Sequence, residues 1–231
     1  MVVTSDYKFS FNGVYSSTYG VTIAEQLTSV IPKMRYSTTN IDGYNGSKII
    51  KQGYETIEYQ LKINFKWERL SDIKKWLTGK GKLILPDDTE KYYDAEILDR
   101  IEFKKKLIFG EATIKFLLQP IKHNVNPKVV QITQGTVVEN KGDFTTMPIL
   151  TITAINNVEL FVNGVKYCKL MFGGTRRTLV IDGQKQDCFF NNSLANRSMD
   201  GDFPELSVGN NTITYTGNVT SASMEVCEQW V

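Results

Sequence analysis

The sequence contains very few of the residues on which metal binding and nucleophilic catalysis most often depend. Among 231 residues there is one histidine, His123, and there are three cysteines, Cys168, Cys188 and Cys227. A histidine cluster for a metal ion is therefore excluded. A Ser-His-Asp or Cys-His site would have to use His123, which lies in a stretch expected to be a linker. We expect no catalytic residue, no cofactor and no metal site.

The three cysteines lie in the last third of the chain at wide spacing, and none forms a C-x-x-C pair. An odd number without such a pair is atypical of a disulfide framework or a zinc site. The sequence therefore predicts three reduced thiols in or near a core.

Long apolar runs and a large net charge are also missing. No stretch approaches the roughly 20 apolar residues of a transmembrane helix. Residues 1–8 lack the basic and then apolar segments of a secretory signal peptide, so we expect folding in a cytoplasm and no membrane partner. With 27 basic and 25 acidic residues the net charge is +2, which argues against a dedicated nucleic-acid-binding protein.

Paired carboxylates are the remaining option for an enzyme. Glycoside hydrolysis needs two carboxyl groups that face each other across a cleft. Both acidic groups in this chain instead lie among turn-forming residues, where aspartate supplies local backbone hydrogen bonds, so we expect turns and no enzyme. The two groups are Asp87, Asp88 and Glu90, and Asp200, Asp202 and Glu205.

Strand patterns dominate what is present. In residues 57–67 every odd position is apolar and every even position is polar, which predicts a strand with one buried face. One helix is predicted over residues 70–77, where apolar residues recur at helical spacing, with Ser71 as its cap and Trp76 as a core anchor. Lys104–Lys106 is predicted to be the solvated tip of a hairpin.

Residues 35–53 fit no core element. Glycine, asparagine and serine interrupt any period, yet five apolar residues are interspersed, and a loop of this length in a compact domain is often functional. Two interpretations stay open: an arm that buries these residues on a neighbouring subunit, or a hairpin or loop folded back on its own domain. The candidate interface residues are Tyr36, Ile41, Tyr44, Ile49 and Ile50.

The composition changes near residue 120. Pro120, Pro127 and the polar residues between them predict a linker, and hence domains at 1–126 and 127–231. Beyond it, Asn163-Gly164 and Asp182-Gly183 are strong two-residue hairpin signals between short strands. No convincing helix follows residue 127, so the second domain is predicted to be an all-β sandwich.

Four segments in order carry a resemblance to a known family. They are Phe9-x-Phe11-Asn12-Gly13 with Tyr19-Gly20-Val21, the helix with Trp76-Leu77 followed by Pro86-Asp87-Asp88, Met147-Pro148-Ile149-Leu150, and Gly201-Asp202-Phe203-Pro204-Glu205-Leu206 with Gly209-Asn210-Asn211. Together they resemble the distal tail proteins of siphophages that infect Gram-positive bacteria, over nearly the whole chain. The last segment is the most specific of the four.

The resemblance implies a mainly β fold: an N-terminal β-barrel-like domain with one helix, and a C-terminal galectin-like β-sandwich. It also implies a virion protein, made in the host cytoplasm, that forms a homo-hexameric ring at the tail tip. Such a ring joins the tail tube protein to a tail-associated lysin, fibre or receptor-binding protein, and DNA crosses its channel. An arm near residues 35–53 would reach the adjacent subunit.

A carbohydrate-binding module of the tail tip is the alternative function, because galectin-like sandwiches often hold sugars on aromatic side chains. Four aromatic residues of the second domain are candidates for such a platform. They are Tyr167, Phe189, Phe190 and Trp230. This chain is too short for the additional carbohydrate-binding module that longer family members carry, which weakens the alternative.

Overall fold

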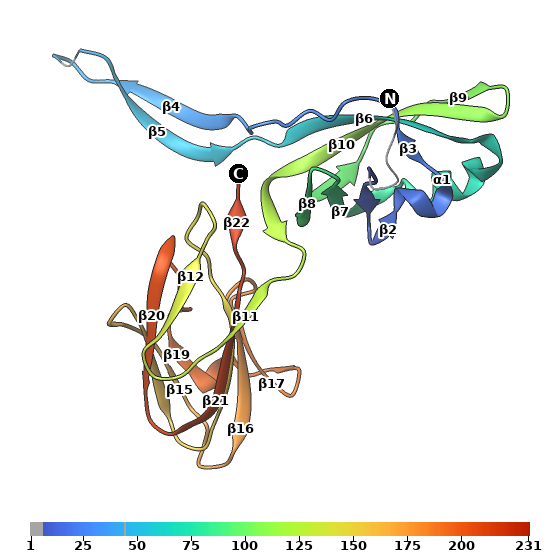
Figure 1. The fold of residues 1–231 in the computed structure, drawn as a ribbon. Helices are drawn as coiled ribbons and strands as arrows, with labels where there is room; N and C mark the ends of the chain where they lie inside the picture. The colour runs from blue at the N-terminus through green and yellow to red at the C-terminus, as the bar shows by residue number, and fades with distance from the viewer. Residues whose placement is uncertain (1–6, 44) are drawn as a thin grey trace. The chain divides into compact units, whose positions relative to one another are not determined.

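The computed structural model describes residues 7–43 and 45–231, and the chain divides into two compact units (Figure 1). The N-terminal unit is Met1–Val125 with Val231, and the C-terminal unit is Asn126–Trp230. Each unit has its own hydrophobic core. Strands make up most of both units, which confirms the predicted mainly β fold class.

The N-terminal unit is built on one curled sheet in the order β2-β1-β7-β8-β10-β6-β3, with β9 paired to β10 beside β8. The β4–β5 hairpin forms a separate sheet. The strands are β1 (Ser10–Phe11), β2 (Val14–Tyr15), β3 (Thr22–Ile23), β4 (Met34–Asn40), β5 (Ser47–Tyr54), β6 (Ile57–Lys66), β7 (Gly79–Leu85), β8 (Asp88–Ile97), β9 (Phe103–Lys106) and β10 (Phe109–Asn124).

Strand β6 follows its sequence pattern over its whole length. Its odd-numbered residues, from Ile57 to Phe65, are buried, and its even-numbered residues, from Glu58 to Lys66, are exposed. The strand pairs with β10 in unbroken antiparallel register from Phe109↔Lys66 to Leu118↔Ile57. The predicted strand over 57–67 is therefore confirmed for residues 57–66, and its buried face forms the centre of the N-terminal core.

The predicted helix is α1 (Leu70–Trp76), and it packs on the sheet through Ile73 and Trp76. A 3₁₀ turn, η2 (Trp67–Arg69), precedes it, so Arg69 is the cap residue and Ser71 already lies within the helix. The expectation that Ser71 caps the helix was wrong for this reason. Trp76 is the core anchor that the sequence predicted: its ring stacks on Phe9 with centroids 5.4 Å apart.

The predicted linker near residue 120 is wrong for residues 120–124. These residues belong to β10, and His123 pairs with Tyr92 of β8 with ring centroids 5.5 Å apart. The register of β10 on β8 shifts between Leu118 and Lys122, and Pro120 lies in that bulge, where a missing N–H costs no ladder hydrogen bond. His123 is half-buried, and burial lowers its pKa.

The C-terminal unit contains two sheets that enclose one core. One has the order β11-β21-β13-β16-β17-β18 and the other β12-β20-β14-β15-β19. The strands are β11 (Lys128–Gln131), β12 (Thr136–Asn140), β13 (Ile149–Ala154), β14 (Val158–Val162), β15 (Val165–Leu170), β16 (Arg177–Asp182), β17 (Asp187–Phe190), β18 (Ser193–Leu194), β19 (Met199–Gly201), β20 (Gly209–Thr216), β21 (Val219–Val226) and β22 (Gln229–Trp230).

One of the two predicted hairpin turns has the expected form. Asn163 and Gly164 join β14 to β15 with φ of 54° and 80°, the left-handed pair that this turn requires. The turn after Asp182 is longer, because Asp187 is the residue opposite Asp182. The Asp182 carboxylate accepts hydrogen bonds from the backbone N–H groups of Gln184 and Lys185, both at 3.1 Å, which stabilises the longer turn.

The segment from Gly201 to Ile213, which carries most of the sequence resemblance, has a structural role. Asn211 is fully buried, and its amide donates to the carbonyls of Ser207 at 2.7 Å and Gly209 at 2.9 Å. Leu206 is also buried and pairs with Thr146 across an isolated bridge. These contacts fix the path of the chain into β20. The residues of this segment therefore have a role in the fold.

The three cysteines are free thiols, as predicted. Cys168 and Cys188 are buried in the C-terminal core, and Cys227 is half-buried. Burial raises the pKa of Cys168 to about 12 and that of Cys227 to about 11.

Candidate functional site: an exposed hairpin arm

Strands β4 and β5 form a hairpin that pairs with no other strand among the described residues, and we call residues 34–54 the arm. The arm extends away from the curled sheet of its own unit (Figure 1). Residues 35–53 therefore lie in a hairpin, but its side chains are almost all exposed, so it is not folded back on its own domain. Burial of the candidate residues on a neighbouring subunit stays a prediction.

Local contacts explain why this polar stretch forms a hairpin. Gly43 and Gly46 take φ of 79° and 104° in the connecting loop, a conformation that favours glycine. The Ser47 hydroxyl donates to the Asn40 side chain at 2.6 Å where the strands begin to pair. At the base, the backbone N–H of Glu55 donates to the carbonyl of Lys33 at 2.8 Å.

The register decides which candidate residues share a face. Tyr36 lies opposite Lys51, and Thr38 lies opposite Ile49, so Tyr36 and Ile49 point to the same side of the arm. They are 59% and 63% exposed. Ile50 lies on the other face, and Ile41 is in the loop. Tyr44, the fifth candidate, lies outside the described residues.

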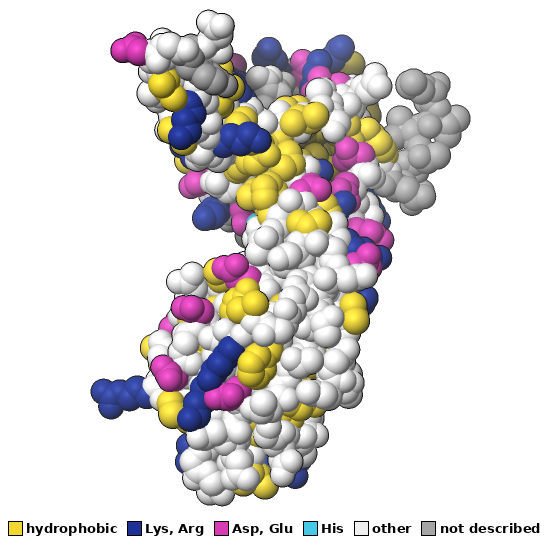
Figure 2. Space-filling view, turned by 90° about the vertical axis from the view of Figure 1, so that its left-hand side faces the viewer, with side chains coloured by type: hydrophobic (Ala, Val, Ile, Leu, Met, Phe, Trp, Pro, Cys, Tyr) yellow, Lys and Arg dark blue, Asp and Glu magenta, His cyan; other side chains and the backbone are white. Residues whose placement is uncertain are grey.

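Two further exposed apolar residues lead into the arm and were not predicted. Val30 and Ile31 precede β4, and Ile31 is 85% exposed. The sequence offered one signal for this segment, Pro32, which directly follows them. Proline favours extended backbone at the residue before it, here Ile31. Figure 2 faces the side of the molecule from which the arm extends. At its upper left, hydrophobic side chains lie beside lysine and arginine side chains.

This combination is characteristic of a contact surface. Both strands of the arm are edge strands, with one row each of unpaired backbone groups, and edges of this kind readily pair with another chain. Isolated two-stranded hairpins are marginally stable in water. Apolar side chains are exposed on both faces of the arm, and exposed apolar patches often mark interaction sites.

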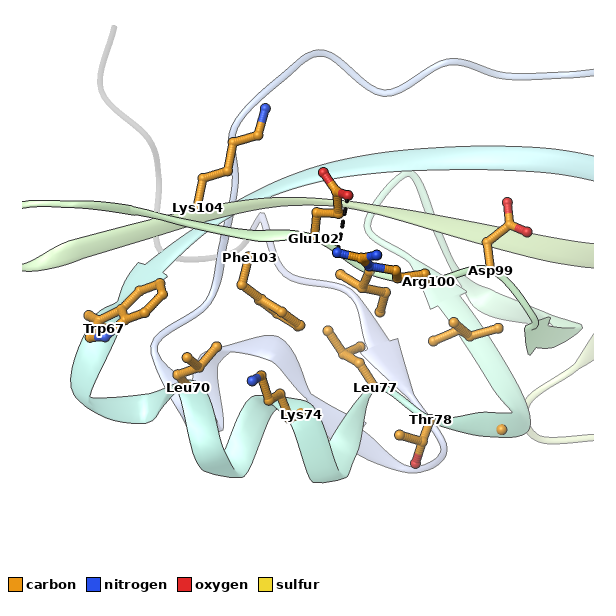
Figure 3. A pocket seen from close by; sticks show the side chains of 13 residues that line it. Trp67, Leu70, Lys74, Leu77, Thr78, Asp99, Arg100, Glu102, Phe103 and Lys104 are labelled. Carbon is orange, nitrogen blue, oxygen red and sulfur yellow. Dashed lines mark ion pairs between the residues drawn. The ribbon is translucent and has the colours of Figure 1, made fainter.

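A second feature of the N-terminal unit is a pocket of about 770 Å³ between α1 and residues 97–104 (Figure 3). Leu70, Leu77 and Phe103 supply apolar lining. Arg100 and Glu102 form an ion pair of 3.5 Å at its rim. This lining suits an amphipathic surface better than acid–base chemistry, because the Glu102 carboxylate is largely exposed and already paired.

The two acidic groups were expected to lie in turns, which is wrong for Asp88 and Glu90 in β8 and for Asp200 in β19. Asp88 begins β8 and forms ion pairs with Lys91 at 3.2 Å and Lys122 at 3.9 Å. Asp200 lies in β19, next to Gly201 with its φ of 109°. Groups of His, Cys, Asp and Glu arranged to hold a metal ion are absent from the described part of the chain.

The aromatic residues proposed as a sugar platform are not gathered together. Tyr167 lies on β15 of the five-stranded sheet, whereas Phe189 and Phe190 lie on β17 of the six-stranded sheet. Phe190 packs against the core, and neighbouring residues of a strand point to opposite faces. Trp230 is in β22, which belongs to neither sheet of the sandwich. The structure therefore brings no such platform together from these residues.

Lys104–Lys106 occupies β9 and is not at the hairpin tip. The tip is Leu107–Ile108, so the prediction of a solvated lysine tip is wrong by two residues, although all three lysines are exposed. Residues 7–43 and 45–231 contain no helix long and apolar enough to cross a bilayer.

No known protein family and no curated protein matches the sequence. Solved structures do match the fold. The SPP1 Dit (gp 19.1) protein, described as a paradigm of the hub adsorption apparatus in phages infecting Gram-positive bacteria, has a TM-score of 0.77 at 15% identity, with 97% of this chain and 99% of that chain covered.

Two chains of the phage P2 baseplate in its activated conformation also match. The one with Ca has a TM-score of 0.57 at 10% identity and covers 97% of each chain, and the one with Sr has 0.54 at 10% identity and covers 96% of each. These neighbours are hub and baseplate proteins. The fold that the resemblance to distal tail proteins implied is confirmed.

Proposed function

We propose that this protein is a structural distal tail protein of a siphophage. Six copies form a ring at the tail tip of the virion after synthesis in the host cytoplasm. The ring joins the tail tube protein on one side to a tail-associated lysin, fibre or receptor-binding protein on the other, and DNA passes through its channel. The protein catalyses no reaction in this role.

The observation that carries the proposal is the extent of the likeness to SPP1 Dit. It covers 97% of this chain, so the match takes in both units. The two strands of the arm contain 7 and 8 residues. Together they are longer than the part of the chain outside the match, which is 3% of its residues. At least some of the arm's strand residues therefore lie within the match.

The physical chemistry of the arm supports a ring. In a cyclic assembly each contact joins two different surfaces, one from each neighbouring subunit. An arm that leaves its own unit provides one such surface. Covering Tyr36, Ile49 and Ile50 on the adjacent copy would remove apolar area from water and satisfy edge strands that a monomer leaves open.

Light scattering coupled to size exclusion, at rising protein concentration and with negative-stain imaging, tests the proposal. We expect a species with six times the 26.2 kDa of the chain, seen as a six-fold ring. Deletion of residues 38–48, which removes the outer half of the arm, should return the protein to a monomer with an unchanged melting temperature for both cores.

Two results would count against the proposal. If the deleted chain still forms the hexamer, the arm is not the contact element. If the intact chain keeps the mass of a monomer at every concentration and no ring is seen, the ring itself is contradicted. Circular dichroism of the deletion variant excludes unfolding as the cause of a lost assembly.

A further inference from the structure

The turn between β9 and β10 carries residues that hairpin turns rarely use. Phe109 lies opposite Lys106, so the turn consists of Leu107 and Ile108. These two residues are 86% and 71% exposed, and Phe109 after them is 52% exposed. Leu107 has a φ of 57°, and a positive φ at the first residue of such a turn normally calls for glycine, because a bulky side chain strains it. We call Leu107–Phe109 the apolar tip.

Other two-residue turns of the chain use the residues that positive φ favours. Asn12-Gly13, Asn163-Gly164 and Asn191-Asn192 each join two paired strands. The φ angles of these residues lie between 48° and 80°. Leu107 has the same backbone conformation with a side chain that is both strained and directed into water. This combination indicates that the leucine serves a contact outside its own chain.

Lysines flank the apolar tip on both faces of the hairpin. Lys66 and Lys106 share a row with Phe109 on one face. Lys105 points to the other face, where its ammonium lies 5.6 Å from the centre of the Trp67 ring. All three lysines are exposed and, in the described part of the chain, take part in no ion pair. The tip is thus an apolar apex between cations, not one flat charged face.

Fewer carboxylates than lysines lie near the tip. Glu111 lies opposite Lys104, behind the apolar residues. Glu68 follows Trp67, whose backbone N–H donates to the carbonyl of Ile108 at 2.9 Å. Four lysines, at 66 and 104–106, and two glutamates give this end of the sheet a net charge of +2. Two ion pairs in the adjoining segments add no net charge: Arg69 with Asp72, and Arg100 with Glu102.

Trp67 places an indole beside the apolar tip. Its backbone is bonded to Ile108, and its ring is half-buried and stacks with Phe65 at 6.3 Å. An indole has an apolar body and a polar N–H, so tryptophan is enriched where lipid headgroups meet acyl chains. Aliphatic apex, flanking lysines and adjacent tryptophan are together the composition of a segment that enters the surface of a bilayer.

The same features fit nucleic acid less well. Single-stranded nucleic acid is held by aromatic side chains on which bases stack, whereas Leu107 and Ile108 at the apex are aliphatic. They also ask for no shaped partner, because acyl chains rearrange around a convex apex and a folded protein would need a matching socket. Anionic lipids attract lysines close to the membrane surface. A lipid surface is therefore the occupant that the chemistry of the tip favours.

The spacing along the hairpin matches the depth of such an insertion. A strand advances about 3.3 Å per residue, so Lys104–Lys106 lie about 3–10 Å behind Leu107. Peripheral segments bury their apolar side chains about 5–10 Å into the boundary between headgroups and acyl chains. With Leu107 at that depth, the lysines lie at the level of the lipid phosphates, and their long side chains keep the ammonium groups there.

We propose that the apolar tip inserts into the surface of an anionic lipid bilayer, with the four lysines against the lipid phosphates. The tip lies at the end of the curled sheet opposite to the arm (Figure 1), so the inference goes beyond the proposed ring and does not depend on it. The expectation of no membrane partner rested on the missing spanning segment and signal peptide, and a tip that enters only the bilayer surface needs neither.

Co-sedimentation of the intact chain with lipid vesicles tests the proposal. One set of vesicles contains phosphatidylcholine with phosphatidylglycerol, and the other contains phosphatidylcholine alone; lipid is titrated at low and high salt. The tip variant is Leu107→Gly with Ile108→Ser, which gives the turn residues suited to its backbone. It should therefore unfold at the same or a higher urea concentration than the intact chain, so lost binding does not come from lost folding.

The intact chain should bind the anionic vesicles, and the tip variant should bind them about tenfold or more weakly. Lys104→Gln with Lys106→Gln should weaken binding about fivefold for each lysine removed, and high salt should weaken it further. Lys75→Gln with Lys128→Gln, at exposed positions outside the tip, is the matched control and should change little. Acyl chains carrying bromine should quench the fluorescence of the intact chain and quench Trp67→Phe less.

Three results would overturn the inference. The intact chain would bind neither set of vesicles at any lipid concentration. The tip variant would bind like the intact chain while the lysine variant does not, which would mean adsorption by charge without insertion. The intact chain would bind a DNA oligonucleotide through the same lysines and leave the vesicles unbound. None of these bears on the ring, which light scattering tests separately, so either proposal can fail while the other stands.

Discussion

Gly110 lies directly opposite Phe65 in the antiparallel register of β10 and β6, and the Phe65 ring fills the space that a side chain at Gly110 would need. A Cβ added at Gly110 would lie 2.4 Å from Cζ of that ring. The ring cannot simply swing aside, because it packs edge-on against Phe103 at 5.8 Å and stacks with Trp67 at 6.3 Å. This pair fixes the start of β10 against the end of β6.

We therefore expect Gly110→Ala to lower the free energy of unfolding by about 1–3 kcal/mol through overpacking. Urea unfolding followed by circular dichroism measures the change. In a Phe65→Leu background the same substitution should cost less, because the smaller side chain leaves room for the methyl group. Equal costs in the two backgrounds would mean that the Phe65 ring is not the obstacle.

The Trp76 indole makes the hydrogen bond that attaches α1 to the N-terminal strands: its Nε1–H donates to the backbone carbonyl of Phe11 at 2.9 Å. Trp76→Phe keeps an aromatic ring near Phe9 but leaves this carbonyl without its donor. The loss of unfolding free energy should be about 1–3 kcal/mol. Lys75→Gln, on the exposed side of the same helix, is the control and should change stability little.

Buried thiols make the protein less stable in alkali. Burial raises the pKa of Cys168 to about 12, whereas an unfolded thiol ionises near 9. The stabilisation is complete below pH 9 and is lost as the pH rises from about 9 toward 12, by at most about 1.4 kcal/mol per pH unit for one group. Burial also raises the pKa of Tyr59 to about 12, from 10.0. The N-terminal unit should therefore also lose stability as the pH rises from about 10 toward 12.

Urea unfolding at pH 7.5 and pH 10.5 checks this expectation. The intact chain should be less stable at the higher pH, and the pH dependence of the C-terminal unit should be smaller in Cys168→Ala, because that variant lacks the titrating group. A thiol reagent should react slowly with Cys168 in the folded chain and quickly in urea. An unchanged pH dependence in the variant would assign the effect to other groups.

The faces of the arm can be tested separately. Ile49→Asp places a charge beside Tyr36 on one face, and Ile50→Asp places one on the other face. If a groove encloses the arm, either substitution should disrupt assembly while leaving the melting temperature unchanged, because both side chains are exposed in the monomer. Val165→Asp, at an exposed apolar position of the C-terminal unit, is the control. Loss of assembly with only one of the two substitutions would indicate that the arm lies flat on its neighbour, with one face in contact.

Elements whose signals are local could be predicted from the sequence. Strand β6 alternates because one face is buried along its whole length, and Asn163-Gly164 forms a two-residue turn because its conformation depends on those two residues. The arm showed no period because both of its faces are exposed and the register shifts at Tyr36, so no pattern of burial was imposed on it.

Other features depended on contacts with distant residues. Pro120 and His123 resembled a linker, but the bulge opposite β8 accommodates the proline within a strand. Lys66, Phe109 and Lys106 form one row across β6, β10 and β9, and this row appears only once the strands are paired. Sequence reasoning named Lys104–Lys106 but could not place Lys106 beside Lys66.

The strand order of the C-terminal unit has a consequence for synthesis. Strand β11 pairs with β21 and β12 pairs with β20, so the first strands of this unit need nearly the last ones as partners. The path β2-β1-β7-β8-β10-β6-β3 of the N-terminal sheet, by contrast, uses strands that all precede residue 125. As the chain leaves the ribosome, the N-terminal unit can fold early, while the C-terminal unit must wait for its final strands and then fold in one slow step.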